Sequence, residues 1–178
     1  PFRHLSLAVG PGVFVPRPET ETVVQHAIDA LLHAPDPSPI AIDLGTGSGA
    51  IALAMATEVP HARVFAAELS PDAHAWARRN TAGVENLTLV LADMADAFPE
   101  LTGLASVVIS NPPYVPDAAI PRDPEVRLFD PAMALYGGAD GLDLVRALSR
   151  NALRLLRPGG LLVIEHGEMQ GSDIRGIL

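Results

Sequence analysis

Residues 40–54 read Ile-Ala-Ile-Asp-Leu-Gly-Thr-Gly-Ser-Gly-Ala-Ile-Ala-Leu-Ala, and this stretch decides the fold. Ile40 to Leu44 is a short apolar run that carries Asp43 and is typical of a buried strand. A glycine-rich turn, Gly45 to Gly49, follows it, and then alanine, leucine and isoleucine recur at helical spacing. Glycines let a backbone approach a ligand closely. The stretch therefore predicts a strand, a ligand-binding turn and a helix in succession.

Two classes of nucleotide cofactor fit this turn. Gly45, Gly47 and Ala50 match the relaxed dinucleotide fingerprint, which implies NAD with its pyrophosphate at a helix N-terminus. Asp43 favours the second class, because a carboxylate repels a pyrophosphate and attracts a cation such as the ammonium group of S-adenosylmethionine. We therefore predict S-adenosylmethionine here and keep a nicotinamide- or nucleotide-binding module as an alternative. The predicted contacts in this stretch are Asp43, Gly45, Thr46, Gly47, Ser48 and Gly49.

Acidic residues also end the next two predicted strands. Arg63 to Glu68 reads as a strand, and Ser70-Pro71 then begins a helix with a cap and a first-turn proline. An acid at this position can accept hydrogen bonds from both ribose hydroxyls, although ribose occurs in both cofactor classes. Leu87 to Leu91 is a third strand, and we place adenine against Asp93 and Met94 after it.

A proline-stiffened turn follows a fourth predicted strand, Ala105 to Ile109. The turn reads Asn111-Pro112-Pro113-Tyr114. Two prolines remove two backbone donors and fix two φ angles, so the turn offers carbonyls, one amide and one aromatic ring without charge. Such a turn suits a substrate with an –NH₂ group on a planar carbon. The alternative is that it is only a stiff loop without a functional role. We predict Asn111, Pro112 and Tyr114 as catalytic, with Pro113 also contacting the substrate.

Together these motifs resemble the release factor glutamine methyltransferases, along essentially the whole chain. Val13 to Glu21 contains Pro-Arg-Pro-Glu-Thr-Glu and looks like the family's first motif, Asp43 to Gly49 like its cofactor loop, and Asn111 to Tyr114 like its catalytic turn. Glu165-His166-Gly167 is similar to a later family signature. Asn-Pro-Pro-Tyr is shared with adenine-N6 methylating enzymes, and the first motif narrows the match to the glutamine branch.

The resemblance implies a class I methyltransferase (Rossmann-like) fold, an open and mostly parallel doubly wound sheet. It implies that residues 1–178 are one catalytic domain, lacking the family's N-terminal helical domain and last two strands. It implies S-adenosyl-L-methionine contacts at Gly45 to Gly49, Glu68 and Asn111, with apolar packing of Met94 on adenine. The implied substrate is the glutamine of the Gly-Gly-Gln loop of peptide chain release factors, its carboxamide held by Asn111 to Tyr114.

Composition agrees with one globular enzyme domain. The 178 residues are 48% hydrophobic and 19% charged, with no cysteine for disulfides or thiolate metal sites. The six histidines lack ligand spacing, so we expect no metal. No membrane span or signal peptide is recognised, which favours the cytoplasm. The net charge of −9 argues against direct nucleic-acid binding, although an adenine-N6 methyltransferase stays an alternative.

Strands alternate with helices along the chain, as in a parallel sheet. Further helices are predicted at Glu19 to His33, Pro71 to Asn80 and Leu142 to Leu156, and a last strand at Leu161 to Ile164. Residues 114–141 are long, rich in Pro, Asp and Gly, and follow the proline turn directly. We predict that this segment is a substrate-facing lid, mobile until substrate enters.

Overall fold

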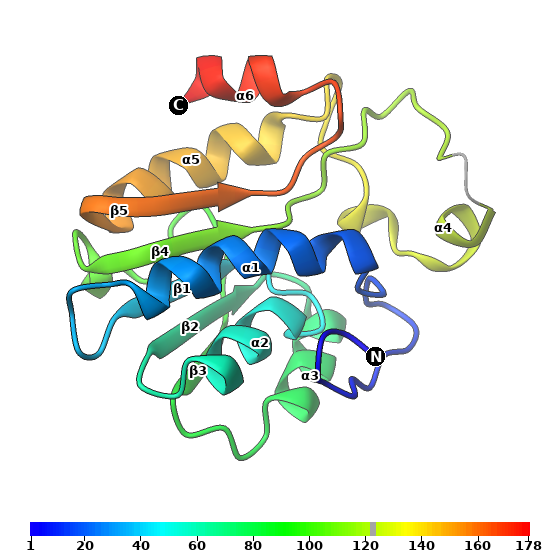
Figure 1. The fold of residues 1–178 in the computed structure, drawn as a ribbon. Coiled ribbons are helices and arrows are strands. Elements are labelled where there is room, and N and C mark those ends of the chain that lie inside the picture. Colours follow the sequence, from blue (N-terminus) through cyan, green and yellow to red (C-terminus); the bar gives the residue numbers. More distant parts are fainter. Residues whose placement is uncertain (122–123) are drawn as a thin grey trace.

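The computed structural model describes residues 1–121 and 124–178, in which five parallel strands form one sheet (Figure 1). The sheet order is β3-β2-β1-β4-β5, so the strand order reverses between β1 and β4. Ligands of open α/β sheets bind at the carboxyl ends of the strands beside such a reversal. The predicted doubly wound sheet is confirmed. The strands are β1 Ile40–Leu44, β2 Arg63–Glu68, β3 Leu87–Leu91, β4 Ala105–Ser110 and β5 Leu156–Ile164.

Helices pack against both faces of the sheet because the side chains of the central strands are apolar on both sides. In β1, Ala41 packs in the cluster with α1 (Pro18–Leu32) and α2 (Ala50–Glu58). Ile42, on the opposite face, packs in the cluster with α5 (Asp143–Leu155). Every residue of β1 is buried, as expected for a central parallel strand.

The remaining helices lie in the connections. They are α3 Pro71–Asn80, η1 Pro99–Leu101, α4 Pro124–Phe129, η2 Ala132–Ala134 and α6 Gly171–Ile177. The predicted start of α3 is confirmed, because Ser70 Oγ accepts a hydrogen bond from Ala73 N at 3.3 Å and Pro71 occupies the first turn.

Two segments differ from the sequence prediction. The last strand begins at Leu156 rather than Leu161, and it includes Pro158-Gly159-Gly160, which lie between the predicted helix and the predicted strand. This strand lies at the sheet edge, where a proline and a shifted register are tolerated. The predicted lid contains α4 and η2 instead of only irregular chain. Its residues 122–123 lie outside the described part of the chain.

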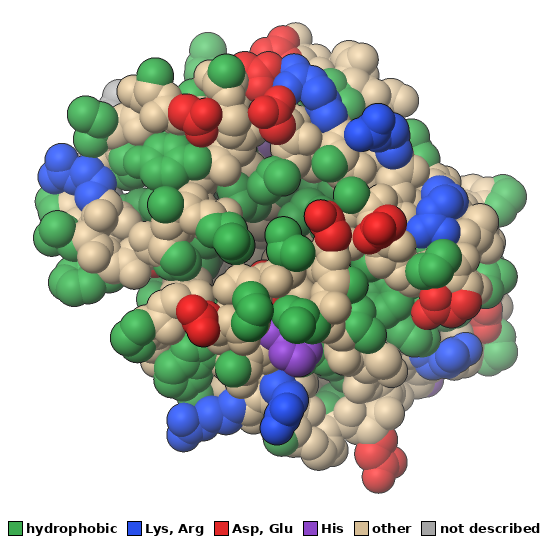
Figure 2. All heavy atoms as spheres, turned by 180° about the vertical axis from the view of Figure 1, so that it is seen from behind, with side chains coloured by type: hydrophobic (Ala, Val, Ile, Leu, Met, Phe, Trp, Pro, Cys, Tyr) green, Lys and Arg blue, Asp and Glu red, His purple; other side chains and the backbone are tan. Residues whose placement is uncertain are grey.

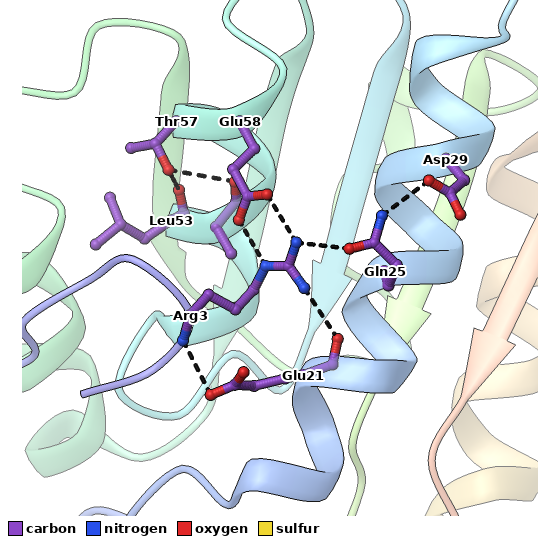
Figure 3. Close-up of polar contacts among 8 residues, drawn as sticks. Arg3, Glu21, Gln25, Asp29, Leu53, Thr57 and Glu58 are labelled. Carbon is purple, nitrogen blue, oxygen red and sulfur yellow. Dashed lines mark hydrogen bonds and ion pairs between the residues drawn. The ribbon is translucent and has the colours of Figure 1, made fainter.

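The N-terminal segment is tied to α1 and α2 by Arg3 (Figure 3). Its guanidinium donates to both Glu58 carboxylate oxygens at 2.6 and 2.7 Å and to Gln25 Oε1 at 2.7 Å. It also donates to the Glu21 carbonyl at 3.2 Å. We call Arg3, Glu21, Gln25 and Glu58 the Arg3 cluster.

Asn80 ties the next part of this segment to the glycine turn. Its Nδ2 donates to the carbonyls of Ala8 and Ser48, both at 2.9 Å, while its Oδ1 accepts from Ala8 N at 2.8 Å. The segment is thereby held beside the glycine turn, and its continuation, residues 12–20, reaches the cavity described next.

Candidate functional site

A cavity of about 390 Å³ lies at the carboxyl ends of the strands, as predicted for this fold. Its walls come from the glycine turn, the end of β2, the chain after β3, the proline turn after β4, and the lid. The structure thus brings together most residues that the sequence nominated. The predicted site residues that line it are Gly45, Thr46, Gly47, Ser48, Glu68, Asp93, Met94, Asn111, Pro112, Pro113 and Tyr114.

Asp43 and Gly49, two of the predicted cofactor contacts, are not among the lining residues that the structure describes. Asp43 is fully buried beneath the glycine turn, where its Oδ2 accepts hydrogen bonds from Thr46 Oγ1 at 2.5 Å and Ala52 N at 3.1 Å. Burial raises the pKa of Asp43 to about 7, against the lowering effect of these two donors. Asp43 therefore holds the glycine turn in place from behind, while residues of the turn itself form the cavity wall.

Glu68 joins the glycine turn to the start of α3. Its Oε2 accepts from Gly47 N and its Oε1 from Ser70 N, each at 2.8 Å. A carboxylate has about four acceptor positions, so two of them stay available for groups in the cavity that Glu68 lines. This geometry suits a pair of hydroxyl donors such as those of ribose.

Met94 closes the cavity above the glycine turn. Its Cε would lie 2.9 Å from a Cβ at Gly45, which has a φ of 76°, so only glycine fits there. Asp93 is exposed, and its Oδ1 accepts from Ala95 N at 2.9 Å. The Met94 side chain gives this part of the wall an apolar surface, which suits a flat ring packed on a thioether.

Asn111 is held from behind by Thr20 and Glu165. Its Nδ2 donates to Thr20 Oγ1 at 3.3 Å, and Glu165 follows β5 at the position beside it, since Glu165 N donates to the Ser110 carbonyl at 3.0 Å. Burial raises the pKa of Glu165, and the side chains of Thr20 and Asn111 lower it. With its NH₂ group engaged on that side, Asn111 has Oδ1 left for the cavity.

The proline turn is braced by two other segments. Val115 N donates to Leu135 O and Gly137 N to Val115 O, both at 2.9 Å. A Cβ at Gly137 would lie 2.5 Å from the Pro113 carbonyl, so glycine is required for this close approach. Gln170 Nε2 donates to the Tyr114 carbonyl at 2.9 Å. Among the described residues, no hydrogen bond reaches the Pro112 carbonyl.

Sequence reasoning missed several residues of the cavity. Phe14, Pro16, Arg17 and Thr20 lie in the first motif, Val13 to Glu21, which was noted but not assigned to the site. Other lining residues that were not named individually come from α2, the start of α3 and the predicted lid, among them Ile51, Ser70, Ala73, Val126, Met133 and Leu135. The motif itself was the signal that would have identified the first group.

The lid packs on the first motif through an ion pair. Arg17 Nη2 lies 2.6 Å from Asp130 Oδ2, whose side chain is only 2% exposed. The same guanidinium lies 5.1 Å from the centre of the Phe14 ring. The predicted location of the lid over the cavity agrees with these contacts, while its mobility stays a prediction.

Polar features elsewhere are limited. His166 is exposed, its Nδ1 lies 2.8 Å from the Gly167 carbonyl, and it is not among the described residues that line the cavity. Within residues 1–121 and 124–178, no cluster of three metal-ligating side chains occurs, and no helix has the length and apolar character needed to cross a membrane. Figure 2 shows basic side chains dispersed over the face drawn there rather than gathered into one band.

The chain is similar in sequence and in fold to known methyltransferases. A family model described as the methyltransferase small domain matches residues 11–138. A release factor glutamine methyltransferase from Streptomyces coelicolor is 55% identical over 174 residues, which cover 97% of this chain and 62% of that protein. A 4-amino-L-phenylalanine/4-methylamino-L-phenylalanine methyltransferase from Streptomyces pristinaespiralis is 46% identical, over 93% of this chain and 58% of that protein.

The chain thus spans less than two thirds of the length of these relatives. Among solved structures, the hMettl16 catalytic domain, in complex with the MAT2A 3'UTR hairpin 6, superposes with a TM-score of 0.71. That likeness covers 98% of this chain and 66% of the other at 15% identity, which speaks to the fold alone. The predicted class I methyltransferase fold and the resemblance noted from the sequence are both confirmed.

Proposed function

This chain belongs to the methyltransferase small domain family, and we propose that it methylates a glutamine side chain in peptide chain release factors. The methyl group would pass from S-adenosyl-L-methionine to the amide nitrogen of the glutamine in a Gly-Gly-Gln loop. The observation that carries the proposal is the orientation of Asn111, whose NH₂ group faces Thr20 and Glu165 while the residue lines the cavity. The 55% identity to a release factor glutamine methyltransferase supports the choice of substrate.

The residues beside the glycine turn fit S-adenosylmethionine. Glu68 has acceptor positions for two ribose hydroxyls, and the Met94 wall suits adenine. The Ser48 hydroxyl is buried in the cavity lining and has no hydrogen-bond partner in the described part of the chain. An orphaned buried hydroxyl is costly, so a polar ligand group would satisfy it. When bound, S-adenosylmethionine supplies a methyl group activated by a positively charged sulfur.

The proline turn would then act by positioning. A glutamine amide nitrogen is a poor nucleophile because its lone pair is delocalised into the carbonyl. Asn111 Oδ1 and the Pro112 carbonyl would accept its two N–H groups and aim the nitrogen toward the glycine turn. Holding two reactants in line is worth up to roughly 7–11 kcal/mol in favourable systems. The same acceptors stabilise the positive charge that develops on the nitrogen, and one N–H proton finally passes to water.

Tyr114 supports this arrangement as a flat surface rather than as a base. Burial raises the pKa of its hydroxyl, with a further contribution from Glu165, so the phenol stays neutral. Its ring lines the cavity beside Pro113 and can pack on the plane of a carboxamide.

An aromatic amine is a second candidate substrate. The specific observations are the 46% identity to a 4-amino-L-phenylalanine methyltransferase and the apolar lid residues that line the cavity, such as Val126 and Met133. An aniline –NH₂ group, like a carboxamide, offers two donors on a planar carbon. The two substrates differ beyond the nitrogen, since a Gly-Gly-Gln loop must bring its flanking glycines into the cavity mouth.

An adenine amino group is the third possibility, since the proline turn is common to enzymes of that class. The net charge of −9 and the dispersed basic side chains in Figure 2 argue against a nucleic-acid substrate. Absence of nucleic-acid binding is an expectation that the assay below tests directly.

The deciding experiment gives the full-length protein labelled S-adenosylmethionine and four separate acceptors. They are a release factor with its Gly-Gly-Gln loop, free glutamine, 4-amino-L-phenylalanine and an adenine-containing oligonucleotide. We expect label on the loop glutamine, located by mass spectrometry, and very little on the other three. Efficient labelling of the amino acid or the oligonucleotide, without the release factor, would replace the proposal by the corresponding alternative.

A further inference from the structure

The direction of the Asn111 amide decides whether the proline turn can hold an –NH₂ substrate. An asparagine side chain ends in an acceptor oxygen and a donor nitrogen that occupy nearly the same volume. If the nitrogen faced the cavity, its N–H groups would meet the N–H groups of the substrate and no hydrogen bond would form. The site therefore needs a device that keeps the oxygen toward the cavity.

The register between β4 and β5 places Glu165 beside Asn111, where it can hold the amide in this orientation. Ser110 pairs with Ile164 in the β4–β5 ladder, and Glu165 N donates to the Ser110 carbonyl at 3.0 Å. The residues that follow these two strands, Asn111 and Glu165, are therefore neighbours. Thr20, which is buried in α1, completes the group from the other side.

A carboxylate accepts hydrogen bonds and cannot donate them. Asn111 Nδ2 donates to Thr20 Oγ1 at 3.3 Å, and both the Thr20 and the Asn111 side chains lower the pKa of Glu165, as hydrogen-bond donors that face a carboxylate do. With its proton turned to Glu165, the Thr20 oxygen can only accept from Asn111. Both contacts thus require the nitrogen end of the amide and reject the oxygen end.

We propose that Glu165 is the positioning residue of this site, which orients the Asn111 amide through direct contact and through Thr20. The inference deepens the proposed function, since it assigns how the –NH₂ acceptor is built. Glu165 is outside the described cavity lining, so it acts through Asn111 rather than on the substrate. Its Oε2 is buried without a hydrogen-bond partner in the described chain, which leaves a negative charge held behind the amide.

Protonation of Glu165 would remove this preference, because a carboxylic acid can accept from the NH₂ end of the amide or donate to its oxygen end. Burial raises its pKa, and Glu19 from α1 adds to that effect, while Thr20, Asn111 and His166 oppose it. Tyr114 faces it as a neutral phenol. Activity should therefore have an acid limb that belongs to Glu165.

The test compares Glu165→Gln with Glu168→Gln in the full-length protein. Glu168 is exposed three residues further along the same loop and is the matched control. We expect Glu165→Gln to lower kcat for the Gly-Gly-Gln protein by about 10- to 100-fold, the range for residues that orient a functional group. Binding of S-adenosylhomocysteine should fall much less than kcat, the acid limb should disappear, and the control should behave as wild type.

A second readout does not depend on methyl transfer. The side-chain amide NMR signals of Asn111, assigned by their loss in Asn111→Ala, should shift with pH in the wild type and not in Glu165→Gln. If Glu165→Gln does not fold, Thr20→Val should show the same fall in kcat and the same weakened pH response.

Wild-type kcat in Glu165→Gln, or Asn111 signals that shift with pH identically in both proteins, would overturn the positioning role. If the wild type transfers no methyl group to the Gly-Gly-Gln protein, the proposed function fails by itself. The pH dependence of the Asn111 signals then tests the positioning role without the assay. A shift in the wild type that is absent from Glu165→Gln supports the role, and identical shifts in both proteins overturn it.

Discussion

The Arg3 cluster and the proline turn both tie polar side chains from distant parts of the chain together, yet they leave different groups free. Arg3 makes hydrogen bonds to four oxygens of Glu21, Gln25 and Glu58 through its guanidinium. Around Asn111 the NH₂ group is engaged, while Oδ1 and the Pro112 carbonyl have no partner in the described chain. The first arrangement stabilises the fold, and the second is prepared for an external donor.

The contrast shows how a binding site can be read from hydrogen bonding. A folded protein rarely leaves acceptors unpaired where water is restricted, because each one costs free energy. Acceptors that line a cavity without a protein partner are therefore available to a ligand that donates. Substitutions in the Arg3 cluster should lower stability, and substitutions in the proline turn should lower methyl transfer. The largest effect is expected at the proline turn.

Asn111→Ala in the full-length protein should lower methyl transfer by about 10²- to 10³-fold, the range for removing one positioned group that stabilises transition-state charge. The free energy of unfolding should change little, because Asn111 is only partly buried. Asn111→Asp should also fail at neutral pH, since its charge stabilises the reactant sulfonium more than the transition state. Kinetics with circular dichroism as the folding control check both changes, and wild-type turnover in either would contradict the mechanism.

Glu68→Ala should weaken S-adenosylhomocysteine binding by about 1.5–3 kcal/mol, the range for hydrogen bonds to a charged group. The change removes the ribose acceptor and also leaves Gly47 N and Ser70 N without their partner. Glu68→Gln keeps one acceptor oxygen, so its affinity for S-adenosylhomocysteine should lie between those of the wild type and Glu68→Ala. Calorimetry measures all three affinities, and an unchanged value for the alanine variant would remove Glu68 from the cofactor site.

Arg3→Ala should lower the free energy of unfolding by about 1–2 kcal/mol, more than an exposed ion pair is worth. The reason is that Glu58 would lose a bidentate partner, and the side chains of both residues are mostly buried. Turnover per folded molecule should stay at the wild-type value, because the Arg3 cluster does not reach the cavity. Urea unfolding measures the loss of stability, and initial rates measure the turnover. A loss of turnover without a loss of stability would contradict the assignment of the Arg3 cluster to the fold alone.

The smallest effect is a pH dependence of stability at the Arg3 cluster. Hydrogen bonding by Arg3 lowers the pKa of Glu58 below its ordinary 4.5. A group with a lowered pKa stabilises the fold above its unfolded pKa and loses that contribution as pH falls through the folded pKa. Unfolding free energy should therefore drop below pH 4.5 in the wild type and drop less in Arg3→Ala. Equal acid slopes in the two proteins would exclude this coupling.

Much of this architecture followed from the sequence because local pattern and global fold agree. The apolar run Ile40 to Leu44, the glycine turn and the capped start at Ser70-Pro71 each specify one local structure. The proline turn was recognisable because two prolines and one asparagine leave few backbone states. Nearly all the predicted site residues line one cavity, because they follow parallel strands whose carboxyl ends meet at one edge of the sheet.

What the sequence did not reveal depends on contacts between distant segments. The support of Asn111 comes from Thr20, which lies 91 positions away in the sequence, and from Glu165, whose place beside Asn111 follows from the register of β4 and β5. The buried place of Asp43 depends on how the turn folds over it. The early start of β5 at Leu156 follows from its place at the sheet edge, which local propensity at Pro158 does not predict.

The central claim is that acceptors of the proline turn hold a glutamine carboxamide for methylation. Its most direct measurement is mass spectrometry of a release factor after incubation with labelled S-adenosylmethionine and either wild-type or Asn111→Ala full-length protein. We predict one added methyl group on the glutamine of the Gly-Gly-Gln loop with the wild type and almost none with the variant. Equal methylation by both proteins, or methylation at another residue, would contradict the account.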